Sequence, residues 1–212
     1  MAHCTITPDR GDRKVFFEFC IKQLNKVNNG HPTNAYLMND RPKNGEIDLV
    51  PRVRQGIELA KRDGFEWAFI FESDDCFPSD YFQRYEPYFK KCDFIGDSTT
   101  FYYNVKTLRW SSFKHAGRAS LFTTAFRISA LEDFVWPPDN SKFLDLAIWK
   151  FARNKKKAFV NSGAIGIKHN SGMVGGKGHI MKLNNADPER KWLKNHVEDY
   201  QFQFYKDLML TL

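Results

Sequence analysis

Apolar residues in the first third of the chain alternate between short continuous runs and helical spacing, which predicts strands and helices in turn. Strands are expected at Cys4–Thr7, Ala35–Met38 and Trp67–Phe71, and helices at Lys14–Val27 and Pro51–Arg62. The order strand, helix, strand, helix, strand is typical of right-handed βαβ units and a mostly parallel sheet. The sequence therefore predicts an α/β fold.

The pattern becomes less regular after Asp80, although apolar runs still alternate with polar segments. The elements expected there are a helix at Tyr81–Lys91, a strand at Asp93–Gly96, an aromatic loop from Phe101 to Arg118, a strand at Leu121–Arg127, a short helical segment at Ile128–Phe134, a helix at Lys142–Arg153, strands at Ala158–Val160 and Ala164–Ile167, and a final helix from Asp187. Asn140 and Ser141 are candidate N-caps for the helix at Lys142–Arg153.

Length and composition indicate one soluble globular domain. The chain has 212 residues, of which 42% are hydrophobic and 27% charged, and no repeat or linker-like stretch divides it. No apolar stretch near Met1 is long enough for a signal peptide or a membrane span, so we expect a cytoplasmic protein. The four cysteines have no CxxC spacing and lie in or beside apolar segments, which is typical of reduced core thiols.

The net charge of +7 at neutral pH indicates an anionic partner. Nucleic acid, an acidic lipid surface and a phosphorylated small substrate all meet that description. The alternative is that surplus lysine only solvates the surface. We favour this alternative for the basic run at Arg153–Lys157, which falls between an expected helix and an expected strand.

The strongest sign of chemistry is the acidic end of the strand that finishes at Phe71. Glu72, Ser73, Asp74 and Asp75 follow this strand directly. Because the strand is continuously apolar, we expect it inside a parallel sheet, and such sheets bind ligands at their carboxyl edge. Carboxylate oxygens suit hard divalent cations such as Mg²⁺ or Mn²⁺. A metal site beside a phosphate-bearing ligand is the functional interpretation, and a solvated turn is the alternative.

Two segments, Pro51–Ala60 and Ala68–Phe82, together resemble the core of the family two glycosyltransferases. In that family an arginine-bearing helix precedes an apolar strand that ends in an Asp-x-Asp signature and a proline. The likeness in order and spacing covers Thr5 to Phe82, although Glu72 stands where the family has aspartate. The resemblance implies a glycosyltransferase A-type, Rossmann-like fold in a single domain, with a mostly parallel sheet flanked by helices.

The resemblance also implies which residues bind a nucleotide-sugar donor. The loop from Thr7 to Arg13 is similar to the one that wraps the donor base, and Asp40 stands where such enzymes contact the base or the ribose. Glu72 or Asp74 would face the ribose and the metal. The donor-binding residues expected on this basis are Thr7, Pro8, Arg10, Arg13, Asp40, Arg54, Glu72, Ser73 and Lys177.

A histidine and a glycine-rich loop late in the chain complete the expected diphosphate site. Many metal-dependent transferases of this fold use a late histidine as a further metal ligand, followed by a glycine-bearing loop and a lysine. His169 has that position, and His179 is the competing candidate. The glycines between them would let backbone N–H groups approach a phosphate, and Lys177 would add charge. The resemblance therefore implies Mn²⁺ or Mg²⁺ held by His169 with Asp74 and Asp75, which compete for the direct ligand position.

The acceptor side is predicted from position along the chain. In inverting members of the family a carboxylate near the start of a helix in this region acts as general base, and Asp145 matches that place. An ordinary charge on the helix surface is the alternative, and a retaining enzyme needs no such base. Interleaved aromatic and basic residues can stack on sugars or bases, or they can pack a core. The acceptor-binding residues expected from this segment are Tyr103, Trp110, His115 and Arg118.

We therefore predict a metal-dependent glycosyltransferase that moves a sugar from a nucleotide-sugar donor, UDP-linked, to a hydroxyl of a glycan or lipid-linked sugar. Residues 1–97 would form the nucleotide-sugar-binding half, residues 98–186 the acceptor and metal–diphosphate half, and residues 187–212 the C-terminal helix. The same chemistry on a hydroxymethylated base of viral DNA is an alternative. A non-catalytic nucleic-acid-binding module and a nucleotidyltransferase are alternatives from other classes.

Overall fold

The computed structural model describes residues 1–9, 13–27, 34–38, 47–169 and 183–209. Its helices are α1 Lys14–Leu24, α2 Leu49–Arg62, α3 Leu144–Phe151, α4 Lys191–His196 and α5 Asp199–Leu208. Its strands are β1 His3–Pro8, β2 Ala35–Met38, β3 Trp67–Ile70, β4 Phe94–Asp97, β5 Thr99–Asn104, β6 Arg109–Lys114, β7 Ala125–Arg127, β8 Lys157–Val160, β9 Ile165–Lys168 and β10 Asn185–Ala186.

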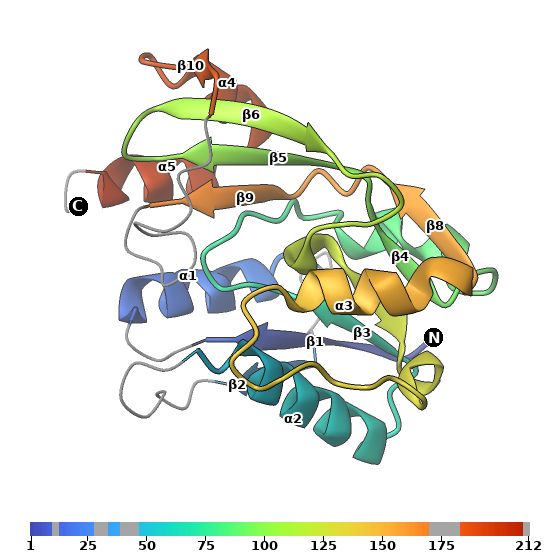
Figure 1. Cartoon of the computed structure of the whole chain (residues 1–212). Coiled ribbons are helices and arrows are strands. Elements are labelled where there is room, and N and C mark those ends of the chain that lie inside the picture. The colour runs from blue at the N-terminus through green and yellow to red at the C-terminus, as the bar shows by residue number, and fades with distance from the viewer. Residues whose placement is uncertain (10–12, 28–33, 39–46, 170–182, 210–212) are drawn as a thin grey trace.

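The larger sheet has six strands in the order β2-β1-β3-β7-β4-β8 (Figure 1). The pairs β1–β2, β1–β3 and β4–β8 are parallel, whereas β7 runs antiparallel to its two neighbours. This arrangement confirms the α/β prediction of a mostly parallel sheet flanked by helices. It also brings the carboxyl ends of β1, β2 and β3 to one edge of the sheet, where ligand sites of open α/β sheets are found.

Strand β3 shows why this sheet is covered on both faces. Ala68 and Ile70 pack with α2 and α3 on one face, while Trp67 and Phe69 pack with α1 on the other. All four side chains are fully buried, since alternate residues of a strand point to opposite faces and both faces are apolar here. Figure 1 shows α2 and α3 on one side of the sheet and α1 on the other.

A second sheet, with the order β10-β6-β5-β9, packs against α1, α4 and α5 through a separate apolar cluster. An isolated antiparallel bridge joins Cys76, in the turn after β3, to Ile165 of β9. Both of its backbone hydrogen bonds are formed, at 3.0 Å and 2.9 Å. This bridge holds the start of β9 beside the acidic turn, although the two segments are far apart in the sequence.

The buried side chain of Gln23 in α1 holds the acidic turn in place. Its Nε2 donates to the backbone oxygen of Asp75 at 2.8 Å, and its Oε1 accepts from the backbone N–H of Phe77 at 3.0 Å. Gln201 of α5 donates to the same Oε1 at 2.9 Å. Because buried backbone groups without partners are costly, this amide fixes the path of the chain just after the carboxylates.

Three of the elements expected after Asp80 were predicted wrongly, at least in part. The expected strand at Leu121–Arg127 begins with a 3₁₀ turn at Leu121–Thr123, and only Ala125–Arg127 forms a strand. Residues 81–91 contain two short 3₁₀ turns, Phe82–Arg84 and Glu86–Tyr88, where a continuous helix was expected. Pro87 has no N–H to donate, and its ring obstructs a helix at that point. The expected aromatic loop at 101–118 contains β5 and β6, which pair as an antiparallel hairpin from Thr99–Lys114 to Asn104–Arg109.

Two helix termini also differ from expectation. Helix α3 begins at Leu144 with Phe143 at its N-cap position, so Asn140 and Ser141 do not cap it. The expected final helix is divided into α4 and α5, because Glu198 and Gln201 form a capping box that starts a new helix. Asp187 accepts hydrogen bonds from the backbone N–H groups at 192 and 193, near the start of α4.

Candidate functional site

A pocket of about 460 Å³ lies at the carboxyl edge of β1 and β3, with walls from both sheets. Its volume is within the range of small-molecule sites in proteins. The acidic turn after β3, the start of α2, the start of α3, the segment at 118–122 and the end of β9 all contribute to its walls. The lining residues used below are Pro8, Arg13, Arg52, Glu72, Asp74, Asp75, Tyr102, His115, Arg118, Ser120, Lys142, Asp145, Lys168 and His169.

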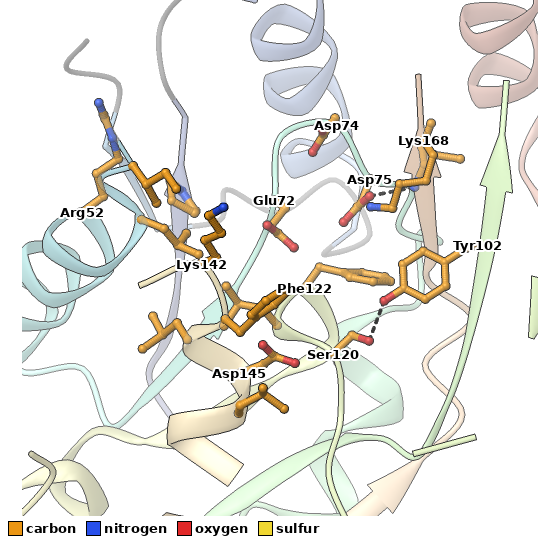
Figure 2. A pocket seen from close by; sticks show the side chains of 18 of the residues that line it. Arg52, Glu72, Asp74, Asp75, Tyr102, Ser120, Phe122, Lys142, Asp145 and Lys168 are labelled. Atoms are coloured by element: carbon orange, nitrogen blue, oxygen red, sulfur yellow. Dashed lines mark hydrogen bonds between the residues drawn. The ribbon is translucent and has the colours of Figure 1, made fainter. Parts of the chain in front are cut away.

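The two aspartates of the acidic turn, both labelled in Figure 2, have different partners. Asp75 is buried and its Oδ1 accepts a hydrogen bond from the backbone N–H of Ile167 in β9 at 2.7 Å. Asp74 lies on the other side of the turn, where its Oδ2 is 2.9 Å from Nε2 of His169. Asp74 therefore contacts the histidine that was predicted as a metal ligand, whereas Asp75 is hydrogen-bonded to the backbone of β9.

Arg13, at the start of α1, closes a triangle with this Asp74–His169 pair. Its Nη1 donates to Oδ2 of Asp74 at 2.6 Å and lies 3.2 Å from Nε2 of His169. Burial alone would raise the pKa of the Asp74 carboxyl, but Arg13 and His169 together hold that pKa well below its usual range. These two neighbours therefore favour the charged form of Asp74.

A second group of titratable side chains, Glu72, Asp75 and Lys168, also lines the pocket (Figure 2). Burial raises the pKa of Glu72 to about 7, with the Asp74 charge adding to the effect and Lys168 opposing it. Burial likewise raises the pKa of Asp75 well above its usual range, against the charge of Lys168. Burial would lower the pKa of Lys168, but the nearby carboxylates outweigh it and the pKa is raised.

The raised pKa of Glu72 predicts a pH-dependent effect of Glu72→Gln. Between the ordinary value of 4.5 and about 7, the folded state keeps a proton that the unfolded chain has lost. Wild-type stability therefore falls relative to the variant as pH rises through that window, and the difference is constant above about pH 7. We expect Glu72→Gln to gain about 1–3 kcal/mol over wild type between pH 5 and pH 8, because a pKa unit corresponds to about 1.4 kcal/mol.

Urea unfolding of both proteins at pH 5 and pH 8 measures this difference. Other groups with raised pKa values, such as Asp97, cancel in the comparison. Glu58→Gln, which alters an exposed glutamate of α2, is the matched control and should leave the wild-type pH profile in place. A difference between wild type and Glu72→Gln that is the same at both pH values would contradict the environment described for Glu72.

Only part of a metal site is present in the described residues. They contain no group of three or more His, Cys, Asp or Glu side chains that could hold a metal ion. The 2.9 Å between Asp74 Oδ2 and His169 Nε2 nevertheless matches one edge of an octahedral site, where ligands about 2.1 Å from the ion lie about 3.0 Å apart. Two protein ligands fit Mg²⁺ or Mn²⁺ when phosphate oxygens and water complete the coordination.

The opposite wall of the pocket holds the predicted base and two of the predicted acceptor residues. Asp145, in the first turn of α3, accepts from Nη1 of Arg118 at 2.8 Å. His115 lies with its Nε2 3.2 Å from the Oγ of Ser120, and that Oγ is 2.7 Å from the hydroxyl of Tyr102. Hydroxyl and imidazole groups in such a chain can bind the hydroxyls of a ligand, and Figure 2 shows Asp145 and Glu72 pointing into the same space.

The other two predicted acceptor residues lie outside this wall. Tyr103 and Trp110 are paired across the hairpin and stack on Trp192 of α4, with ring centroids 5.9 Å and 4.5 Å away. Because successive side chains of a strand point to opposite faces, Tyr102 faces the pocket and Tyr103 faces the α4–α5 side. The period-two alternation along β5 could have shown that only one of these tyrosines reaches the pocket.

Arg52, which the sequence reasoning missed, reaches the pocket from α2, whereas Arg54 does not line it. Arg54 Nη2 lies 3.1 Å from Oδ1 of exposed Asp139. Arg52 is buried and donates to the backbone oxygens of Asp9 at 2.8 Å and Met38 at 2.6 Å, which ties the ends of β1 and β2 together. Helical spacing could have identified it, since position 52 lies on the buried face of α2.

Not all of the donor-binding residues predicted at the strand ends line the pocket. Pro8 lines the pocket, whereas Thr7 is fully buried within β1. Ser73 is buried and donates to Oδ1 of Asp9 at 2.7 Å, so it joins the ends of β1 and β3. Arg10, Asp40, Lys177 and His179 lie outside the described residues.

Two lysines of the pocket wall were also missed. Lys168 follows an apolar strand directly, as Glu72 does, so its position at a strand end was the available signal. Lys142 precedes α3 and has no comparable signal in the sequence. Both lysines bring positive charge to a pocket that is also lined by Glu72, Asp74, Asp75 and Asp145, so the pocket offers basic and acidic groups to a polar ligand.

Comparisons with known proteins support the fold. No family model and no curated protein matches the chain. The crystal structure of A197 from STIV matches with a TM-score of 0.54 at 14% sequence identity, over 76% of this chain and 83% of that one. TarS 1–349 of S. aureus in complex with UDP-GlcNAc has a TM-score of 0.49 at 11% identity, over 81% of this chain and 60% of that one.

Fold and site together define an α/β protein with a charged ligand pocket at the carboxyl edge of its larger sheet. At 14% identity, the likeness to A197 shows a shared fold and nothing about activity. No helix in the described part of the chain is both long and apolar enough to cross a membrane.

Proposed function

We propose that this protein is a glycosyltransferase of the A-type fold that moves a sugar from a nucleotide-sugar donor to an acceptor hydroxyl. One observation carries the proposal. Asp74 in the turn after β3 and His169 after β9, 95 residues apart, present adjacent ligand atoms at 2.9 Å on the wall of a pocket at the sheet edge. A carboxylate and an imidazole placed in this way suit a cation that binds a diphosphate.

The donor would lie with its diphosphate beside this pair. Asp74 and His169 would hold Mn²⁺ or Mg²⁺, which when bound offsets the negative charge that develops on the leaving diphosphate. Arg13 and Lys142 line the same pocket and can pair with phosphate oxygens. Pro8 lies at the end of β1, where the base and ribose of a nucleotide would be bound.

The acceptor would enter against the opposite wall. Its hydroxyl oxygen forms a bond to the anomeric carbon of the sugar, the bond from that carbon to the diphosphate oxygen breaks, and the hydroxyl proton passes to Asp145. Arg118, which donates to Asp145 at 2.8 Å, orients the carboxylate for this transfer. His115 and Ser120 would bind further hydroxyls of the acceptor. This assignment makes the enzyme an inverting one.

A thermal-shift screen of nucleoside diphosphates and nucleotide sugars, with and without Mn²⁺, tests the proposal. A ligand that binds only the folded state raises the apparent stability by RT ln(1 + [L]/Kd), so the correct donor stands out. We expect a UDP-linked sugar to raise the melting temperature more in the presence of Mn²⁺ than in its absence. No shift with any nucleotide or nucleotide sugar would overturn the proposal.

Product analysis then separates the alternatives. Transfer releases a nucleoside diphosphate, whereas a nucleotidyltransferase would release pyrophosphate. A glycan or lipid-linked sugar as acceptor predicts transfer that does not need DNA. A hydroxymethylated DNA base predicts DNA binding that falls steeply with added salt, because counterions are released when lysine and arginine neutralise phosphates.

A further inference from the structure

The guanidinium group of Arg13 lies where a divalent cation would bind. Its Nη1 is 2.6 Å from Oδ2 of Asp74 and 3.2 Å from Nε2 of His169, and those two atoms are 2.9 Å apart. The side chains are 15%, 20% and 3% exposed, in that order. The charged nitrogen is therefore largely shielded from water, so its attraction to the carboxylate is stronger than it would be on the open surface.

Arg13 and a metal ion cannot use this pair at the same time. A divalent cation within about 2.1 Å of both Oδ2 and Nε2 would occupy the space that Nη1 fills. It would also place the divalent cation and the Arg13 guanidinium within a few ångströms of each other in a partly desolvated site, where they repel each other. One cation has to leave before the other can bind.

We propose that Arg13 is an internal cation that occupies the Asp74–His169 pair in the nucleotide-free protein and gives way when the divalent ion arrives with a diphosphate. The inference rests on the proposed function, because the diphosphate supplies the new partner for the displaced guanidinium. Arginine pairs well with phosphate oxygens, and Arg13 already lines the pocket. Arg13 is therefore a positioning residue that couples metal binding to nucleotide binding.

The coupling has a measurable consequence. In the absence of nucleotide the metal has to displace Arg13 without compensation, so the metal binds weakly. With nucleotide present, the displaced guanidinium regains an anionic partner, so metal and nucleotide each strengthen the binding of the other. Removal of the guanidinium should abolish the cost of displacement and leave Asp74 and His169 available to Mn²⁺ alone.

Mn²⁺ titration of the nucleotide-free protein, followed by the electron paramagnetic resonance signal of the free ion, tests the inference. Arg13→Gln is expected to bind Mn²⁺ about tenfold more tightly than wild type, since a hydrogen bond to a charged group is broken by the metal only in wild type. Arg13→Lys keeps the charge but not the planar fork, so it should fall between them. Arg54→Gln, which alters an arginine of α2 outside the pocket wall, is the matched control and should bind as wild type does.

Unchanged or weaker Mn²⁺ affinity in Arg13→Gln would overturn the inference. Thermal unfolding of each variant shows whether it is folded. If Arg13→Gln does not fold, Arg13→Lys provides the test, and an Mn²⁺ affinity equal to that of wild type would contradict the inference. The metal titration uses no nucleotide, so its result is separate from the donor screen. A protein that binds a nucleotide sugar but shows no gain in Arg13→Gln keeps the proposed function and loses the inference. Tighter Mn²⁺ binding in Arg13→Gln, together with no binding of any nucleotide sugar, would support Arg13 as an internal cation and contradict the proposed function.

Discussion

Asp74→Asn is expected to lower sugar transfer by about 100- to 1,000-fold while the protein stays folded. The amide has the shape of the carboxylate and can still accept from Arg13, but it carries no charge to bind a divalent cation or to balance one. The loss should appear as a smaller turnover number and as the disappearance of the Mn²⁺-dependent thermal shift with donor.

The matched control for this prediction is Asp139→Asn, which removes an exposed carboxylate that pairs with Arg54 outside the pocket. It removes the same charge from the same residue type and should change turnover by less than about twofold. Turnover of Asp74→Asn close to that of the control would show that Asp74 has no part in the reaction. It would leave Asp75 as the remaining candidate of the two.

Asp75→Ala is expected to have its main effect on folding, with a loss of about 2–4 kcal/mol in the free energy of unfolding. Removal of the carboxyl group leaves the buried N–H of Ile167 without its acceptor and takes one of the acidic partners from Lys168. Urea unfolding at neutral pH measures this loss. The bridge between Cys76 and Ile165 lies next to the site, so the contact between the acidic turn and β9 should weaken as well.

Asp75→Asn separates this structural role from metal binding. Asparagine keeps an oxygen for the N–H of Ile167 and stands in for the protonated acid that burial favours at Asp75. We expect it to lose less than about 1 kcal/mol and to keep the Mn²⁺-dependent shift that Asp74→Asn loses. Abolition of that shift in Asp75→Asn, with Asp74→Asn unaffected, would reverse the roles of the two aspartates.

Much of the fold could be predicted because it depends on contacts close in the sequence. The order of strands and helices from β1 to β3 follows from continuous apolar runs in the strands and from the helical spacing of apolar residues in α1 and α2. The position of Glu72, Asp74 and Asp75 at a strand end follows from the abrupt end of an apolar run. The two helices that were predicted wrongly are also interrupted by local features, Pro87 and the capping box at Glu198, which are visible in the sequence.

The direction of a side chain can be predicted from the sequence only where the residue belongs to a helix or strand with a regular period. Arg52 lies on the buried stripe of α2 and Arg54 does not, and Tyr102 and Tyr103 point to opposite faces of β5. Both distinctions follow from the geometry of helices and strands. The sequence prediction missed them because a loop, the structure expected for the aromatic segment, has no alternation, and because Arg54 was implied by the family resemblance and not by helical spacing.

Local sequence patterns were enough to predict an α/β core with carboxylates at the end of a buried strand. The groups that contact those carboxylates depend instead on how distant segments pack together. Arg13, Asp74 and His169 come from the start of α1, the turn after β3 and the end of β9, and no local pattern relates their positions. Their meeting depends on strand order, on the Cys76–Ile165 bridge and on the packing of α1, since contacts between distant segments are set by how the whole chain packs.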